Sequence, residues 1–347
     1  MERLQGKRIA LIGGAGFVGH HLALRLREIC SEVLVVDSLQ VNNLLYYLAT
    51  EQQIENRDLY VAMLRERIEL LHRAKVHLNA TDARDYLKIS LVLGAFKPQI
   101  IVHLAAVAHA DRSNKDPYST FDHSLRTLEN TLDYARGPES CVEQFIYFSS
   151  SMVYGNFPGG CVTEDTPCNP LGIYGALKYA GEKLVIAYHQ VFGLPYTIIR
   201  PSALYGPRCV SKRVIQIFIE RAIARKEIVI RGNGSDALDF TYIDDLIQGV
   251  ILCMGNPAAY GQTFNMTYGQ ARTLTDVLRI LRTHFPSLLM RYEPRDTLMP
   301  ERGTLSIQKA QEKVGYRPLF PLENGLEAYV EWYRSFRESQ KLDAGEA

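Results

Sequence analysis

A glycine-rich turn near the start of the chain limits the fold more than any other feature. The segment GGAGFVG places Gly13, Gly16 and Gly19 at three-residue intervals. It is preceded by the apolar run RIALI and followed by HLALRLREI, in which apolar residues recur on one helical face. A second apolar run, EVLVV, ends at Asp37. A strand, a glycine turn, a helix and a second strand with a terminal carboxylate predict a dinucleotide-binding βαβ unit.

Each glycine of this turn has a separate expected role. Gly13 permits the tight turn, Gly16 lets the backbone approach the pyrophosphate at the helix N-terminus, and Gly19 allows close helix–sheet contact. Asp37 is expected to accept hydrogen bonds from the adenosine ribose hydroxyls. Because its carboxylate would repel a 2′-phosphate, NAD is favoured over NADP. Asp82, just after the third predicted strand, is expected either to meet the adenine edge or to cap a helix.

Short apolar runs alternate with amphipathic stretches through the first 150 residues. The expected strands lie within residues 8–14, 32–37, 75–82, 99–106 and 144–150. This alternation predicts right-handed βαβ crossovers and an α/β fold with a doubly wound, Rossmann-type parallel sheet. Beyond residue 200, glycine and proline become frequent and the segments shorten, which indicates a smaller C-terminal α/β substrate lobe.

The two parts are not expected to follow one another simply along the chain. We expect the NAD-binding domain to comprise residues 1–200 with a return segment at about 236–268. The substrate-binding lobe then comprises residues 201–235 and 269–340. Two helices of the lobe are expected to begin near Thr273 and Asn324, which are candidate N-cap residues.

A long connection, residues 39–74, separates the second and third predicted strands. Within it, Val61, Leu64, Ile68 and Leu71 form one apolar stripe, which predicts a helix that covers the sheet. The preceding segment NNLLYYL either belongs to that cover or helps to close over a cofactor or substrate.

Composition and charge argue against several classes of protein. With 39 basic against 38 acidic side chains, the net charge of +1 gives no electrostatic reason to expect a nucleic-acid partner or an anionic membrane surface. No apolar run approaches the length of a bilayer span, and the N-terminal segment lacks the features of a signal peptide. The six cysteines form no CxxC pair, which predicts reduced thiols, no metal site and a cytoplasmic enzyme.

Tyr174 and Lys178 stand four residues apart in IYGALKYAGEK, so a helix would place both on one face. A nearby ammonium stabilises a phenolate, which makes Tyr174 a usable general base or acid. The same spacing also occurs by chance on exposed helix faces. Here, however, the pair follows SSSMVYG, a hydroxyl-rich strand end at the carboxyl edge of the sheet, where such folds bind ligands. A serine hydroxyl there can hydrogen-bond the reacting oxygen.

Six segments together resemble the extended short-chain dehydrogenase/reductase superfamily: GGAGFVG, VHLAAVAHADRSNKDP, FSSSMVYG, YGALKYAGEK, RPSALYGPR and LDFTYIDDL. Within it, the chain is similar to the nucleotide-sugar epimerase/dehydratase family, and most like UDP-sugar 4-epimerases. The resemblance implies bound NAD, a nucleotide-diphosphate sugar substrate and a homodimer. It also implies that Tyr174 is the catalytic base, that Lys178 additionally holds the nicotinamide ribose, and that Ser150 is the catalytic hydroxyl.

The resemblance extends this assignment to further residues. Those expected to bind the cofactor are Gly13, Gly16, Phe17, Val18, Gly19, Asp37, Ser38, Asp82, Ala83, Leu104, Ala105, Ala106, Ser149, Tyr174, Lys178 and Pro201. Those expected to bind the substrate are Ser151, Met152, Ser202, Ala203, Arg208, Arg213, Arg231, Arg295 and Arg302.

The residues after Ser150 bear on the reaction. Dehydratases of this family place Asp-Glu there and the decarboxylases carry a Glu, whereas this chain has Ser151 and Met152. The resemblance therefore favours C4 epimerisation of a UDP-hexose or UDP-hexuronate through a 4-keto intermediate, with hydride passing to and from tightly bound NAD. The alternatives are a dehydratase with displaced acid and base residues, a decarboxylase or a 3,5-epimerase. A non-catalytic NAD-binding protein is disfavoured by the intact catalytic trio.

Three positions depart from the family pattern. Leu238 replaces an arginine that binds the substrate diphosphate, and Val210 replaces an arginine that binds a uronate carboxylate, which weakens a uronate substrate. His123 replaces a common asparagine and is interpreted as a helix-packing residue.

The implied dimer would form through helices at about residues 117–136 and 174–192. The apolar candidates for its interface are Leu177, Leu184 and Val185.

Overall fold

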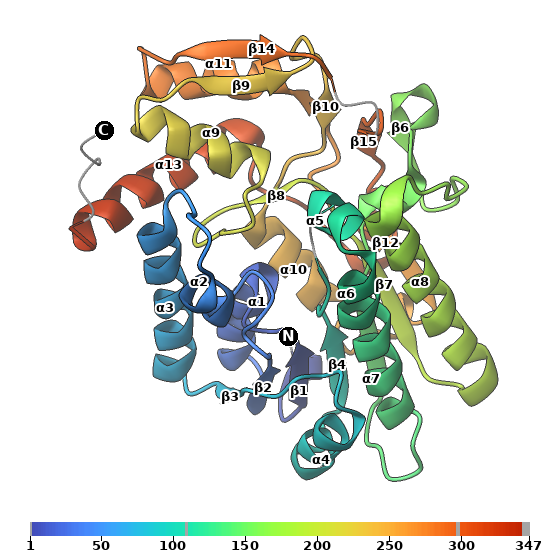
Figure 1. The fold of residues 1–347 in the computed structure, drawn as a ribbon. Coiled ribbons are helices and arrows are strands. Elements are labelled where there is room, and N and C mark those ends of the chain that lie inside the picture. The colour runs from blue at the N-terminus through green and yellow to red at the C-terminus, as the bar shows by residue number, and fades with distance from the viewer. Residues whose placement is uncertain (1, 108–109, 296–298, 342–347) are drawn as a thin grey trace.

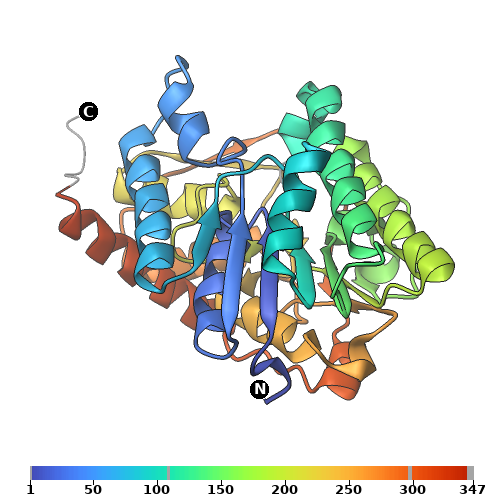
Figure 2. The ribbon, with the colours of Figure 1, turned by 90° about the horizontal axis from the view of Figure 1, so that it is seen from below.

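The computed structural model describes residues 2–107, 110–295 and 299–341. A parallel sheet of seven strands forms its centre, in the order β12-β7-β5-β4-β1-β2-β3 (Figures 1 and 2). Its strands are β1 (Arg8–Ile12), β2 (Glu32–Val36), β3 (His77–Asn79), β4 (Ile100–His103), β5 (Gln144–Phe148), β7 (Tyr196–Arg200) and β12 (Gln262–Asn265). The predicted α/β fold with a doubly wound parallel sheet is confirmed.

Helices cover both faces of the sheet. On one face lie α1 (Phe17–Arg27), α3 (Arg57–Arg73) and α10 (Ile243–Cys253), and on the other α4 (Tyr86–Phe96), α7 (Thr127–Ala135) and α8 (Gly172–Phe192). Successive residues of β1 alternate between these two cores, and Ile9, Ala10, Leu11 and Ile12 all have no exposed surface. This two-sided burial explains why the strands read as continuous apolar runs rather than alternating ones.

A second group of elements lies beyond the carboxyl ends of the strands (Figure 1). Its strands pair as β9 (Ile228–Arg231) with β14 (Met290–Glu293), β10 (Ala237–Leu238) with β13 (Arg272–Thr273), and β6 (Cys161–Val162) with β15 (Thr304–Leu305). Its longer helices are α9 (Val214–Ile223), α11 (Leu274–His284) and α13 (Leu322–Ser339). Phe218, Leu278 and Tyr329 of these helices join the same continuous core as Leu22 of α1. The smaller lobe therefore packs on the core that α1, α3 and α10 form on one face of the sheet, here called the cofactor-side core.

The chain passes from this lobe back to the main sheet. Strand β11 (Thr241–Tyr242) pairs in parallel with β8 (Leu204–Tyr205), and α10 then packs on α1. Strand β12 takes the edge of the main sheet beside β7. Residues 241–265 thus lie within the predicted return segment.

The helix predicted in the long connection is α3, but it is turned from the expected orientation. Leu64 and Leu71 are buried as predicted, whereas Val61 and Ile68 are only half-buried. Tyr60 and Arg67 take the inward positions instead. Both have polar partners inside, because Tyr60 donates to Glu220 of α9 and Arg67 donates to the carbonyl oxygen of Ala15.

Three local predictions have different outcomes. Thr273 caps α11 in a capping box with Asp276, as predicted. The prediction for Asn324 is wrong, since α13 begins one turn earlier, with Pro321 at its N-cap. Val185 is 1% exposed and lies on the inner face of α8, packed in the core against the sheet, so it is unavailable to a dimer interface.

The remaining helices are α2 (Leu44–Ala49), α5 (Ala110–Lys115), α6 (Pro117–Phe121) and α12 (Gln308–Val314). All six cysteines are free thiols. Within the described residues, no helix combines the length and apolar character needed to span a bilayer.

Candidate active site

The glycine turn joins β1 to α1 in close contact with its surroundings. Gly13 has a φ of +77°, and a Cβ there would lie 2.7 Å from the backbone nitrogen of Ala105. A Cβ on Gly19 would lie 2.5 Å from the carbonyl oxygen of Gly14. Helix α1 begins at Phe17, and its N-cap, Gly16, provides no side-chain cap. The turn therefore presents uncapped backbone N–H groups and leaves space for a diphosphate.

A cavity, here called the cofactor cavity, runs from this turn along the carboxyl edge of the sheet. Every residue predicted for the cofactor lines it, from Gly13 to Pro201. The other residues of its lining are Val36, Val41, Asn42, Arg67, Thr81, His123, Thr127, Phe148, Leu204, Ser211 and Arg213. Of these, Asn42 belongs to the segment NNLLYYL, for which closure over a cofactor was one of the two expectations. Val41 and Asn42 precede α2, so the start of the long connection does contribute to the wall. This shape and these backbone donors fit a dinucleotide.

Asp37 follows β2 and is held by the backbone. Its two carboxylate oxygens accept hydrogen bonds from the N–H groups of Ala15, at 3.0 Å, and Leu39, at 2.8 Å. Desolvation raises the pKa of Asp37, and the two N–H groups oppose that rise. Each oxygen keeps a second lone pair, so the carboxylate remains able to accept from a ribose hydroxyl.

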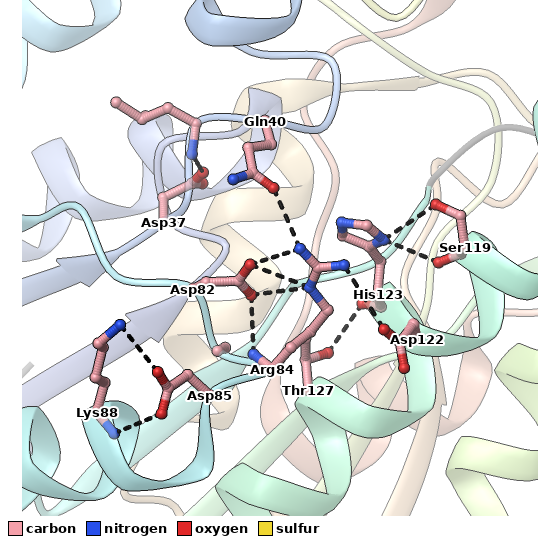
Figure 3. Close-up of polar contacts among 12 residues, drawn as sticks. Asp37, Gln40, Asp82, Arg84, Asp85, Lys88, Ser119, Asp122, His123 and Thr127 are labelled. Atoms are coloured by element: carbon pink, nitrogen blue, oxygen red, sulfur yellow. Dashed lines mark hydrogen bonds and ion pairs between the residues drawn. The ribbon is translucent and has the colours of Figure 1, made fainter.

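Asp82 also lines the cofactor cavity, and it lies within a cluster of charges (Figure 3). It forms an ion pair of 2.6 Å with Arg84, which also lies 3.6 Å from Asp122. Although desolvation opposes it, hydrogen bonding from Arg84 lowers the pKa of Asp82. Helix α4 is capped by Asp85, so the alternative prediction of Asp82 as the helix cap is wrong. Its placement in the cavity wall is compatible with the adenine prediction.

His123 lies in a π-helical turn, Asp122–Arg126, between α6 and α7. Its Nδ1 is 2.8 Å from the carbonyl oxygen of Ser119, a helix-packing contact as expected (Figure 3). The side chain also lines the cofactor cavity, which the packing interpretation did not anticipate.

Tyr174 and Lys178 lie on α8 and both line the cofactor cavity. The Nζ of Lys178 donates to the carbonyl oxygen of Phe148 at 2.6 Å, at the end of β5. Burial lowers the pKa of Lys178 to about 7. Lys178 is thereby fixed against the sheet, one helical turn from Tyr174.

A buried ion pair missed by the sequence analysis supports the serine-rich strand end. Ser149 donates to Glu182, and Arg200 forms a bidentate pair with the same carboxylate, at 2.7 and 2.9 Å. The side chains of Arg200 and Glu182 are 6% and 2% exposed. Arg200 also donates to the hydroxyl of Tyr154 at 2.8 Å. Through Ser149, Glu182 and Arg200, these hydrogen bonds connect the end of β5 with α8 and β7.

A smaller cavity, here called the reaction chamber, adjoins the cofactor cavity. Its lining is Ser150, Ser151, Met152, Tyr174, Pro201, Ser202, Ala203, Leu204, Arg213 and Arg302. The Ser150 hydroxyl accepts a bond of 3.2 Å from the backbone N–H of Met152. Arg302 contacts the sulfur of Met152, and burial lowers its pKa to about 10, so it stays charged at neutral pH. Among the described residues, no aspartate or glutamate lines this chamber.

A third cavity, here called the outer cavity, opens from the reaction chamber toward the lobe. Tyr174, Arg213 and Arg302 line both, and Arg231 and Leu238 line the outer cavity alone. Within the described part of the chain, none of these three arginines forms an ion pair with a carboxylate. Three guanidinium groups without an acidic partner make the site suited to an anionic ligand.

The structure places two predicted substrate residues outside these cavities. Arg208 is directed into the cofactor-side core, where its Nε lies 3.0 Å from Nε2 of His20 and its Nη1 lies 3.4 Å from Glu66. Arg295 pairs with Asp236 at 3.0 Å. Both guanidinium groups are already engaged, so the structure does not support either prediction.

Comparisons with known proteins identify the family of the chain. The model of the NAD dependent epimerase/dehydratase family matches residues 9–267. The chain is 29% identical to a UDP-glucose 4-epimerase of Mycolicibacterium smegmatis, over 94% of this chain and 99% of the relative. It is similar in fold to the UDP-glucose 4-epimerase of Thermotoga maritima with UDP-glucose, with a TM-score of 0.79, 27% identity, and coverage of 94% of this chain and 99% of that one.

A second solved structure extends the comparison to the cofactor. The Thermus thermophilus UDP-glucose 4-epimerase in complex with NAD matches with a TM-score of 0.79 and 26% identity, over 94% of this chain and 99% of that one. The chain is also 28% identical to UDP-glucuronate 4-epimerase 1 of Arabidopsis thaliana, over 97% of this chain and 79% of the relative.

Proposed function

The chain belongs to the NAD-dependent epimerase/dehydratase family, with NAD as its cofactor, and on that premise we propose that it is a nucleotide-sugar 4-epimerase. The proposed substrate is a UDP-hexose or a UDP-hexuronate, inverted at C4 through a 4-keto sugar. The 4-epimerases among its relatives, one solved with UDP-glucose, support this substrate class.

The observation that carries the proposal is the chemistry of the reaction chamber. Loss of water or of carbon dioxide from a sugar requires further acid or base groups beside the reacting carbons. Ser151 and Met152 stand where such carboxylates would be expected, and the described lining contains none. Tyr174 carries the one phenol of the described lining, and we assign the proton exchange to it. One group of this kind is sufficient for oxidation and reduction at a single carbon.

Each member of the catalytic trio then has a defined task. Tyr174 removes the proton from the 4-hydroxyl and returns it to the oxygen after the sugar has presented its other face. Ser150 donates a hydrogen bond to the same oxygen. Lys178, fixed by the Phe148 carbonyl, holds the nicotinamide ribose and stabilises the phenolate of Tyr174. When bound, NAD supplies a reversible hydride acceptor for C4.

The arginines of the outer cavity complete the proposal. Arg213, Arg231 and Arg302 line the outer cavity, and we propose that they bind the substrate diphosphate; Arg213 and Arg302 also line the reaction chamber. They would take the place of the family arginine that Leu238 replaces. Because the diphosphate anchors the substrate, the sugar itself can make few contacts. The 4-keto sugar can then rotate, so that either face of C4 can accept the hydride.

The direct test is incubation of purified protein with UDP-glucose, UDP-galactose and UDP-glucuronate, followed by NMR and mass spectrometry of the products. We expect an isomer of equal mass, reached from either epimer. A product that has lost water or carbon dioxide would instead identify a dehydratase or a decarboxylase.

The substitution Tyr174→Phe tests the catalytic role assigned to this residue. It should lower turnover by roughly 100-fold or more and leave the NAD content of the purified protein unchanged. Turnover equal to that of the wild type would remove Tyr174 from the mechanism.

A further inference from the structure

One buried cation of the cofactor cavity has no role in the arrangement described so far. Arg67, on α3, is 1% exposed and lines the cavity together with the glycine turn. Burial lowers its pKa to about 10, so the guanidinium keeps its proton at neutral pH. A buried charge is costly unless an opposite charge or enough hydrogen bonds compensate it.

Hydrogen bonds of Arg67 use only part of its donor capacity. Its Nε and Nη2 donate to the carbonyl oxygen of Arg208, and its Nη1 donates to the carbonyl oxygen of Ala15 at 3.4 Å. A guanidinium carries five N–H bonds, and these contacts occupy three. Ala15 belongs to the glycine turn, so Arg67 lies beside the part of the cavity that fits a diphosphate.

The charges around Arg67 do not neutralise it. In the described part of the chain, no carboxylate lies within ion-pairing distance of its guanidinium. Arg208 repels it. Asp37 attracts it from a greater distance, but the oxygens of Asp37 already accept from Ala15 and Leu39. His20 is nearby, but burial lowers its pKa well below the usual value and keeps it neutral.

We propose that Arg67 binds the diphosphate of NAD and supplies the buried positive charge that the glycine turn lacks. The proposal follows from three features together: a fully buried cation, unused N–H donors, and placement at the turn. It rests on NAD as the cofactor and is independent of which reaction the enzyme performs. It also gives the long connection between β2 and β3 a binding role, since that connection carries α3.

The proposal predicts a loss of affinity confined to ligands that contain the diphosphate. Protein stripped of NAD is titrated with ADP and with adenosine by calorimetry. Arg67→Gln should weaken ADP binding by roughly 10- to 100-fold, as expected for a lost charged hydrogen bond, and leave adenosine binding within about twofold. Arg65→Gln, an exposed arginine of the same helix, is the matched control and should alter neither.

A purely structural role for Arg67 gives a different result. If the residue only joins the Ala15 and Arg208 carbonyls, its loss should weaken adenosine and ADP equally, and that outcome overturns the proposal. Unchanged ADP binding in Arg67→Gln also overturns it. Should this variant fail to fold, Arg67→Lys is used instead, because lysine keeps the charge but cannot form the two hydrogen bonds that Arg67 donates to the carbonyl oxygen of Arg208. Any loss must then be confined to ADP, and a parallel loss of adenosine binding refutes the proposal.

Discussion

Substitution of Gly19 by alanine tests how the glycine turn builds the cofactor cavity. The added Cβ would lie 2.5 Å from the carbonyl oxygen of Gly14, about 0.9 Å closer than an ordinary 3.4 Å contact. Because the Cβ is attached rigidly to the backbone of α1 and the oxygen belongs to the backbone of the turn, α1 must move away from the turn and β1. Overpacking of this kind costs about 1–3 kcal/mol, and the helix propensity of alanine returns up to about 1 kcal/mol. With the full return, we expect a net loss of about 0–2 kcal/mol in the free energy of unfolding.

The same movement displaces the helix N-terminus from the diphosphate. NAD affinity should therefore fall by roughly tenfold or more, measured by calorimetry on stripped protein. Gly94→Ala is the matched control, since a Cβ there meets no atom within 4 Å and Gly94 lies inside α4. It should raise stability by about 0.5–1 kcal/mol and leave NAD binding unchanged. If urea unfolding and calorimetry found Gly19→Ala as stable and as able to bind NAD as Gly94→Ala, close packing of Gly19 would not shape the cofactor cavity.

Three further predictions concern the surrounding residues. Glu182→Gln breaks a buried ion pair and should lower the free energy of unfolding, measured in urea, by about 3–5 kcal/mol. The control Glu129→Gln, whose partner Arg126 is exposed, should lower it by at most about 1 kcal/mol. Equal losses in the two variants would contradict this expectation. Burial lowers the pKa of Lys178 from 10.5 to about 7, so the folded state binds fewer protons between those values. The free energy of unfolding of the wild type should accordingly rise relative to Lys178→Met from pH 7 to pH 9, by roughly 1 kcal/mol per pH unit, and a pH-independent difference would count against the shift. Arg302→Gln should weaken UDP binding by roughly tenfold without changing NAD content, and unaltered UDP binding would remove Arg302 from the diphosphate site.

The sequence predicted the features that depend on short-range pattern. The strand runs and the glycine turn determined the order of elements, because apolar periodicity and φ freedom are local properties. The residues expected around NAD line one cavity because they follow the carboxyl ends of successive parallel strands. That placement is a property of the topology and does not require knowledge of side-chain packing.

Features that depend on long-range pairing were not predictable. Glu182 and Arg200 look like ordinary surface charges in the sequence, and only the contact between α8 and β7 reveals them as a buried pair. Arg67 was missed for the same reason, since an arginine within a helix is normally exposed. Arg208 was assigned to the substrate from its motif, whereas its guanidinium forms an ion pair with Glu66 of α3. Nothing in a local segment indicates which distant helix will cover it.

In the proposed reaction, one proton-transferring tyrosine and a reversible hydride acceptor invert a single carbon. The most direct measurement uses a UDP-sugar substrate labelled with deuterium at C4, in ordinary water, with NMR of the product. We expect the C4 epimer with deuterium retained at C4 and no change in mass. Deuterium lost to water or found on another carbon, or a product of lower mass, would contradict it.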